Sequence, residues 1–231
     1  MFIQNNDCIL FQGDSITDCG RDRQYPDDLG HGYPFFVNAF LKAFHPSLSI
    51  EILNRGISGN RTIDLLGRLE EDCLTLQPKP DIVSFYIGVN EVIWRYKYNE
   101  PTSDIQFERN FREILSRTVD ALQPRLVIME PFVFPRESGV GPLGNPIFGI
   151  DADFISELES KAAITKALAA EFDAKFLPLF SIYRKLGEQK TSTHWAGDSI
   201  HPTPQGHVII AKEWMNLTGV PFMPNHAAEN Q

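Results

Sequence analysis

The stretch Cys8-Ile-Leu-Phe-Gln-Gly-Asp-Ser15 indicates the fold more directly than any other part of the sequence. Its first five residues form a short, mainly apolar run, which is typical of a strand buried on both faces of a parallel sheet. Gly13 then predicts a tight turn that exposes the hydroxyl of Ser15, beside the backbone N–H groups of a helix start. Ser15 is therefore a candidate nucleophile, although a serine that only caps a helix would fit the same residues.

Four more short apolar runs predict strands, and longer amphipathic runs predict helices between them. The further strands are expected at Ser49–Leu53, Asp81–Ile87, Leu126–Glu130 and, most weakly, Lys175–Leu179. Helices are expected at Tyr33–Phe44, Thr62–Leu76, Ser103–Leu122 with Ser103 as the cap, Asp153–Phe172 and Thr203–Leu217 with Thr203 as the cap.

Strands that alternate with helices pair in parallel through right-handed crossovers. The sequence therefore predicts a single domain over residues 1–231, built as a three-layer α/β/α sandwich with a five-stranded, parallel, doubly wound sheet. Active sites of such sheets lie beyond the carboxyl ends of the strands. The Pro- and Gly-rich stretch Pro131–Gly149 is the longest irregular segment, and we expect it to form a lid or a rim loop.

Composition narrows the classes of partner. The formal net charge of -9 repels phosphate backbones and anionic lipids, so neither nucleic acid nor a membrane surface is an expected partner.

Cys8, Cys19 and Cys73 are odd in number and far apart, which favours reduced thiols. No apolar run approaches the roughly 18 residues of a membrane helix, and the polar start does not resemble a signal peptide. These features predict a cytoplasmic protein.

Three further blocks fall where the predicted sheet would bring them to the edge that carries Ser15. Asn54-Arg-Gly-Ile-Ser-Gly59 follows the second strand and Gly88-Val-Asn90 follows the third. Asp198-Ser-Ile-His201-Pro202 precedes the last helix. Taken alone, Gly56 fits a strand-end turn and Asn90 fits an Asx-turn, so the argument rests on the set.

In this order and strand context, the four blocks resemble those of the SGNH (GDSL-type) hydrolases, whose defining letters match Ser15, Gly56, Asn90 and His201. The blocks span residues 13–202. The resemblance implies a flavodoxin-like SGNH hydrolase fold and a serine esterase that needs no cofactor. The stretches 13–21 and 56–60 are similar to the small intracellular acetylxylan esterases of that family. This similarity implies that the substrate is a small ester, with acetylated xylo-oligosaccharide or a related acetylated carbohydrate as the first candidate.

Ester hydrolysis by a serine requires a neighbouring imidazole that takes the hydroxyl proton, and His201 is the matching base. Asp198, three residues earlier, can reach the other imidazole nitrogen and fix its tautomer. The resemblance implies an oxyanion hole formed by the Ser15 N–H, the Gly56 N–H and the Asn90 side-chain amide. Glu91 departs from the Asp that commonly follows this Asn in the family, and its role is left open.

Several other residues offer competing interpretations. Ser58 is the chief alternative nucleophile, but we expect a turn role for it, and we expect Asp14 to orient the turn before Ser15. A metal site is conceivable from four residues that could act as ligands: His194, Asp198, His201 and His207. No Cys or paired-His signature accompanies them, so no metal is predicted.

Aromatic residues near the blocks could stack on a sugar ring. We expect Trp94 and Trp195 to contact substrate, while core or subunit contacts are equally open for both and for Tyr96 and Tyr98. Aromatic surface loops make a homo-oligomer plausible without fixing its symmetry. The same machinery would also fit a broader lipase-like esterase, a thioesterase or an acyltransferase. A catalytically silent carbohydrate-binding homologue is a further alternative.

Overall fold

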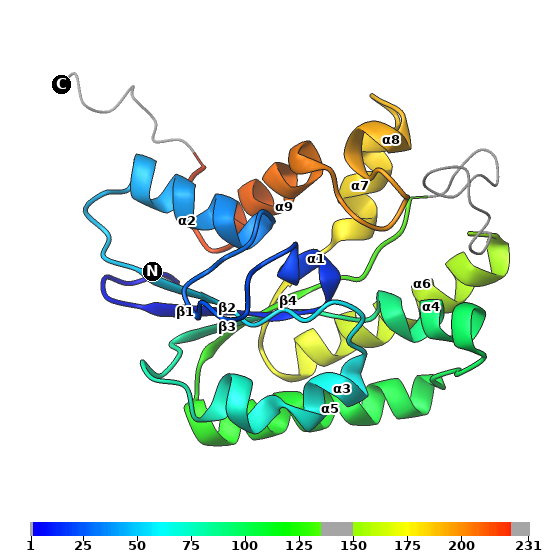
Figure 1. The fold of residues 1–231 in the computed structure, drawn as a ribbon, viewed down its shortest axis with the longest axis horizontal. Helices are drawn as coiled ribbons and strands as arrows, with labels where there is room; N and C mark the ends of the chain where they lie inside the picture. The colour runs from blue at the N-terminus through cyan, green and yellow to red at the C-terminus, as the bar shows by residue number, and fades with distance from the viewer. Residues whose placement is uncertain (1, 135–149, 223–231) are drawn as a thin grey trace.

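The structure is a computed structural model that describes residues 2–134 and 150–222. Its centre is a five-stranded sheet in the order β2-β1-β3-β4-β5, and all four pairings are parallel (Figure 1). The strands are β1 (Cys8–Gly13), β2 (Glu51–Asn54), β3 (Ile82–Tyr86), β4 (Arg125–Met129) and β5 (Lys175–Leu177). The predicted parallel sheet is confirmed.

Helices cover both faces of this sheet, which confirms the three-layer sandwich (Figure 1). One face carries α2 (Tyr33–Phe44), α7 (Leu179–Gly187) and α9 (Pro204–Leu217). The other carries α3 (Thr62–Gly67), α4 (Val89–Tyr98), α5 (Asp104–Leu122) and α6 (Ala152–Glu171). Two short helices, α1 (Ser15–Asp18) and α8 (Ser192–Trp195), precede longer elements at the candidate site.

The position of β1 in the centre of the sheet explains why its sequence is apolar without alternation. Ile9 and Phe11 belong to the core under α2 and α9, where the ring of Phe11 lies 5.2 Å from that of Trp214. Cys8 and Leu10 belong to the second core, on the opposite face. Because successive side chains of a strand point to opposite faces, a central strand covered by helices on both sides must be apolar at nearly every position.

The helix predicted for Thr62–Leu76 is interrupted. α3 ends at Gly67, and a separate π-helical segment, η1, covers Glu70–Leu74. The break lies at Arg68, whose side chain reaches inward to the strand ends. β2 also begins later than predicted, at Glu51, because the backbone N–H of Ser49 donates to the Asn5 side chain instead of to a neighbouring strand.

Besides the short α8, two longer helices were not predicted from the sequence. Val89–Tyr98, for which the sequence analysis gave no helix or strand, forms α4 directly after β3. The fifth strand ends at Leu177, and the residues from Leu179 onward form α7. Both helices follow a strand after only one or two residues, so their apolar positions merge with those of the strand in the sequence.

The predicted lid falls mostly outside the described residues. Of Pro131–Gly149, the structure describes only Pro131–Phe134, and these four residues are buried. Phe132 stacks on Tyr183 of α7 with ring centroids 4.1 Å apart. The single-domain assignment stays a prediction. Within 2–134 and 150–222, no helix is both long enough and apolar enough to cross a membrane.

Arg68 joins the carboxyl ends of β1 and β2 beneath the candidate site. Its guanidinium donates at distances of 2.7–3.1 Å to five acceptors: the Gln12, Asn60 and Asp72 side chains and the Gly13 and Arg55 carbonyls. The side chain is only 13% exposed. Burial lowers the pKa of Arg68 from its ordinary value, and Asp72 partly offsets this effect. A rigid planar fork can satisfy this set of acceptors, whereas an ammonium group cannot.

We predict that Arg68→Met lowers the free energy of unfolding by roughly 3 to 5 kcal/mol, because it removes one partner from a buried polar network. Denaturant unfolding followed by circular dichroism measures this loss. Arg112→Met is the matched control, because Arg112 pairs with Glu108 and Glu171 on the surface and is 39% exposed. Exposed pairs contribute roughly 0 to 1 kcal/mol, so equal losses in the two variants would contradict the proposed role of Arg68.

Candidate active site

The four sequence blocks meet beyond the carboxyl ends of β1, β2 and β3. Ser15 is the first residue of α1, directly after β1, and Asn90 lies in the first turn of α4, directly after β3. The sheet order reverses between these two strands, since β2 lies on one side of β1 and β3 on the other. Such a switch point is the usual ligand site of an open parallel sheet.

Ser15, His201 and Asp198 form a continuous chain of hydrogen bonds. Ser15 Oγ lies 2.8 Å from His201 Nε2, and His201 Nδ1 lies 2.6 Å from Asp198 Oδ2. The other carboxylate oxygen of Asp198 accepts the backbone N–H groups of Ile200 at 3.0 Å and His201 at 2.6 Å. The tight turn between Asp198 and His201 thus fixes both side chains before any substrate binds.

The electrostatics of this pair favour a charged carboxylate beside a basic imidazole. Burial acts to raise the pKa of Asp198, but hydrogen bonds from His201 and Ile200 outweigh it and hold that pKa below its ordinary value. For His201, burial acts to lower the pKa, but the hydrogen bond and negative charge of Asp198 leave it above its ordinary value. Asp14 adds a smaller effect in the same direction.

Asp14 has the turn role that was expected of it. It caps α1, and its Oδ1 accepts the backbone N–H of Ile16 at 3.0 Å. The residue is 1% exposed, and burial raises the pKa of its carboxyl to about 7. The environment therefore separates the pKa values of the two carboxyl groups near Ser15, because that of Asp198 is held low while that of Asp14 is raised.

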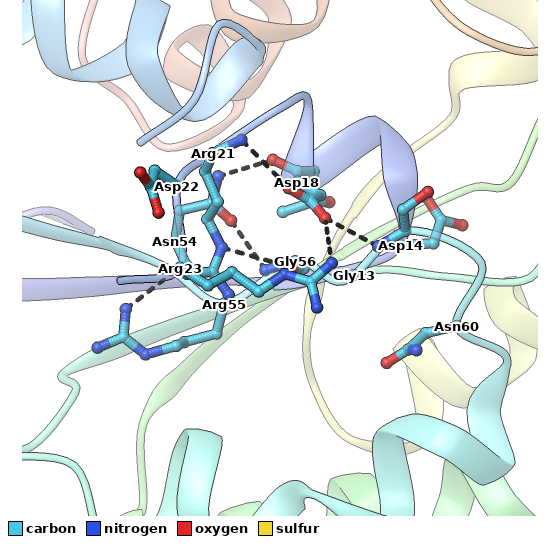
Figure 2. Close-up of polar contacts among 12 residues, drawn as sticks. Gly13, Asp14, Asp18, Arg21, Asp22, Arg23, Asn54, Arg55, Gly56 and Asn60 are labelled. Carbon is cyan, nitrogen blue, oxygen red and sulfur yellow. Dashed lines mark hydrogen bonds and ion pairs between the residues drawn. The ribbon is translucent and has the colours of Figure 1, made fainter. Parts of the chain in front are cut away.

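Gly56 does not have the free N–H that the sequence predicted for it. This N–H donates to Asn54 Oδ1 at 2.8 Å. A Cβ at Gly56 would lie 2.3 Å from the Asp18 backbone nitrogen, so the glycine is required for close packing of the loop against α1. Figure 2 shows Asn54, Gly56 and Asp18 gathered at this contact, with Arg21 and Arg23 bonded to it.

Gly59, three residues further along the same loop, has the opposite surroundings. Its φ is +83°, and a Cβ there would meet no described atom within 4 Å. Within the described residues its N–H has no hydrogen-bond acceptor. The loop before it is held against the Ser15 turn, since Ile57 N–H donates to the Gly13 carbonyl at 3.1 Å and Ser58 N–H to Asp18 Oδ2 at 2.9 Å. Gly59 thus lies between the Ser15 turn and Asn90, and the sequence analysis missed it.

Asn90 and Glu91 both bind this loop. Asn90 is 5% exposed, and its Nδ2 donates to the Asn60 carbonyl at 3.0 Å. Glu91 is fully buried, and its Oε1 accepts the Thr62 N–H at 2.6 Å and the Thr62 hydroxyl at 2.8 Å. Burial raises the pKa of Glu91 despite these bonds. The carboxyl of Glu91 therefore anchors the start of α3.

The alternative nucleophile and the candidate metal ligand His207 have other roles in the structure. Ser58 is exposed, and it contacts Asp18 through its backbone N–H, not through its hydroxyl. His207 is buried, with Nδ1 accepting the Tyr33 N–H at 3.1 Å and Nε2 lying 3.4 Å from Cys19 Sγ. Burial lowers the pKa of His207 to about 4. Across the residues that the structure describes, no three His, Cys, Asp or Glu side chains group as metal ligands.

The two tryptophans predicted to contact substrate have different surroundings. The Nε1–H of Trp94 donates to the Gly59 carbonyl at 3.1 Å, and the guanidinium carbon of Arg61 lies 3.8 Å from the ring centroid. The Nε1–H of Trp195 donates to the Leu186 carbonyl at 3.1 Å. Trp195 is half-buried and three residues from Asp198. Other residues of the protein thus contact Trp94 at its ring edge and on one of its two ring faces.

Comparisons with known proteins identify the family. The model of the GDSL-like lipase/acylhydrolase family matches residues 11–209. An acetylxylan esterase of Geobacillus stearothermophilus is 31% identical over 230 residues, covering 95% of this chain and 97% of the relative. The solved structure of an acetylxylan esterase from that organism matches with a TM-score of 0.84 and 28% identity, over 98% of this chain and 100% of the other.

A second solved structure, from Parabacteroides merdae and described as a GDSL-like lipase, matches with a TM-score of 0.85 and 31% identity, over 94% of this chain and 97% of the other. The family match covers far more than half of the chain, and it includes the strand ends, loops and hydrogen-bonded side chains described above. The chain therefore belongs to the GDSL-like lipase/acylhydrolase family and is an ester-bond hydrolase.

Proposed function

We propose that the protein is a serine carboxylester hydrolase that removes short acyl groups, with acetyl groups of xylo-oligosaccharides or related small esters as its substrates. The observation that carries this proposal is the hydrogen-bonded chain from Ser15 through His201 to Asp198, with distances of 2.8 and 2.6 Å. The acetyl preference is supported by the likeness to acetylxylan esterases. The three free cysteines fit a reducing, cytoplasmic setting.

In the proposed mechanism, Ser15 Oγ attacks the ester carbonyl carbon while its proton passes to His201 Nε2. Asp198 holds the Nδ1 proton and stabilises the imidazolium that forms. The tetrahedral intermediate expels the alcohol, which takes the proton from His201, and leaves an acyl group on Ser15. Water then attacks this acyl group with His201 again as the base, which releases the acid and restores the Ser15 hydroxyl.

The oxyanion hole that we propose differs in one residue from the expectation based on sequence. Ser15 is the first residue of α1, so its N–H has no partner within the helix. Asn90 uses one amide hydrogen on the Asn60 carbonyl, which leaves the second for the oxyanion. Because the Gly56 N–H is bound to Asn54, we assign the third donor to the Gly59 N–H.

Trp195 remains our proposed substrate contact, since it is half-buried and close in sequence to Asp198. Its ring edge is anchored to α7, which would present a rigid aromatic surface to a sugar at low entropic cost. A homo-oligomer stays a prediction.

Replacing the nucleophile gives the most direct test of the catalytic assignment. Ser15→Ala is expected to lower kcat on the order of 10⁶-fold while leaving the circular dichroism spectrum unchanged, because no other group can form the acyl intermediate. Ser58→Ala is the matched control, and it should retain nearly full activity. If the Ser58 variant were inactive and the Ser15 variant active, the nucleophile would be assigned to the wrong serine.

The rate should increase with pH as His201 loses its proton, because only the neutral imidazole can accept the Ser15 proton. Since Asp198 raises the pKa of His201, the midpoint of the kcat/KM profile is expected above the ordinary value of about 6.5. In Asp198→Asn the midpoint should move down, and kcat should fall by about 10⁴-fold. A midpoint that does not move in this variant would argue against the pairing.

Substrate choice is best tested by release of free acetate from acetylated xylo-oligosaccharides, measured beside p-nitrophenyl esters of increasing acyl length. We expect kcat/KM to be highest for acetyl and to fall steadily with chain length. A preference for long acyl chains would instead favour the lipase-like alternative. Transfer of acetyl to an alcohol or thiol acceptor without acetate release would favour an acyltransferase.

A further inference from the structure

Four consecutive residues contact α4, namely the last three of the loop after β2 and the first residue of α3. The Gly59 carbonyl accepts from Trp94 Nε1 at 3.1 Å, and the Asn60 carbonyl accepts from Asn90 Nδ2 at 3.0 Å. The guanidinium of Arg61 lies over the Trp94 ring, with its carbon 3.8 Å from the centroid. Thr62 completes the series through its two bonds to Glu91. Residues 59–62 are therefore fixed in register against one turn of α4.

The spacing along α4 explains this register. Asn90 and Trp94 are four residues apart, so their side chains emerge from the same face of the helix, one turn apart. They bind two neighbouring carbonyls of the loop, at Gly59 and Asn60. The Asn90 amide, which is proposed to contact the oxyanion, and the Trp94 indole, which does not need to contact it, thus hold the same short segment of the loop.

The hydrogen bond from Trp94 to the Gly59 carbonyl restricts the direction in which the Gly59 N–H can point. Peptide planes are rigid, and only the φ and ψ rotations at Ser58 and Gly59 connect this N–H to its surroundings. The plane before it is anchored by Ser58 N–H on Asp18. The plane after it makes two bonds, because Trp94 donates to the Gly59 carbonyl at 3.1 Å and the Asn60 N–H donates to the Ile57 carbonyl at 3.2 Å. The Asn60 bond only closes a turn within the loop, so the Trp94 bond is the one that fixes this plane against α4. Glycine has wide freedom in φ, so without the Trp94 bond the Gly59 N–H could turn away from the Ser15 side.

The environment of Trp94 leaves little of its ring for a sugar. One face is covered by Arg61, and the ring of Tyr98 lies 4.9 Å away at an interplanar angle of 59°. Arg61 is itself held by Asp64 at 3.2 Å and Glu100 at 3.4 Å. A cation stacked on an aromatic ring and fixed by two carboxylates is not readily displaced by a neutral sugar.

We infer that Trp94 is a positioning residue, whose indole N–H holds the Gly59 carbonyl and thereby aims the Gly59 N–H at the oxyanion. This inference rests on the proposed function. It assigns Trp94 to the reaction that all ester substrates share, in place of the sugar contact expected from the sequence. Preorganised donors act in the transition state, so Trp94 should affect kcat more than KM, with or without a sugar in the substrate.

The decisive variant is Trp94→Phe, which keeps an aromatic ring for Arg61 and removes only the N–H donor and part of the ring. The rates to compare are kcat and KM for p-nitrophenyl acetate, which has no sugar, kcat and KM for acetylated xylo-oligosaccharide, and the rate at which a fluorophosphonate labels Ser15. Labelling forms a tetrahedral adduct that needs the same donors. Replacing Trp94 by benzothienylalanine, in which sulfur takes the place of the N–H in a ring of the same shape, is the second variant.

We expect kcat for both esters and the labelling rate to fall together by roughly 10-fold, less than the roughly 10² or more for loss of a donor outright. KM should change little. Tyr98→Phe is the matched control, since it keeps the ring beside Trp94, and its rates should equal those of the unchanged protein. Thermal unfolding by circular dichroism ensures that all rates are measured on folded protein.

Two results would overturn the inference. The first is an increased KM for acetylated xylo-oligosaccharide with unchanged labelling and unchanged kcat for p-nitrophenyl acetate, which would make Trp94 a sugar contact. The second is a lower melting temperature with no change in any rate of the folded protein, which would make its role structural. Failure of the unchanged protein to label at Ser15, or full activity of Ser15→Ala, would instead contradict the proposed function.

Discussion

β1 pairs in parallel with β2 on one side and β3 on the other, and the site depends on this pairing. The register places Phe11 opposite Asn54 and Gly13 opposite Tyr86, so all three strands end within a short distance of each other. The Ser15 turn, the loop 55–61 and α4 therefore begin at one edge of the sheet. Parallel direction is essential, because an antiparallel neighbour would start its following segment at the opposite edge.

Polar side chains, more than apolar packing, fix the segments that leave this edge. Asn54 binds the Thr17 and Leu29 carbonyls through Nδ2 and the Gly56 N–H through Oδ1. Arg68 joins the loop to the ends of β1 and β2, and α4 holds residues 59–62. A loop cannot satisfy its own backbone groups as a helix does, so buried side chains must supply the partners. The same contacts would keep the proposed oxyanion donors aligned before substrate arrives.

Burial has different consequences for the ionisable groups around Ser15. Asp198 accepts three hydrogen bonds, which hold its pKa below the ordinary value. Asp14 and Glu91 are more deeply buried and accept fewer hydrogen bonds, so their pKa values are raised. The two histidines differ in the same way. His201 gains a carboxylate partner, while the Nδ1 of His207 accepts the Tyr33 N–H and must remain unprotonated to do so. Only His201 among them combines basicity with a hydrogen bond to Ser15.

The amino-acid sequence alone predicted the parallel sheet and identified Ser15, Asn90, Asp198 and His201 as candidates for one site, because buried strands are apolar at nearly every position and the blocks follow them in a fixed order. It did not determine which glycine of the 54–59 block has a free N–H, since Asn54 binds Gly56 only in the folded loop. Nor did it separate a sugar contact from a backbone anchor at Trp94. Helix α4 is itself absent from the sequence pattern, and only its packing against the loop brings the indole to the Gly59 carbonyl. Such roles depend on the direction of single N–H and C=O groups, which periodicity and spacing do not encode.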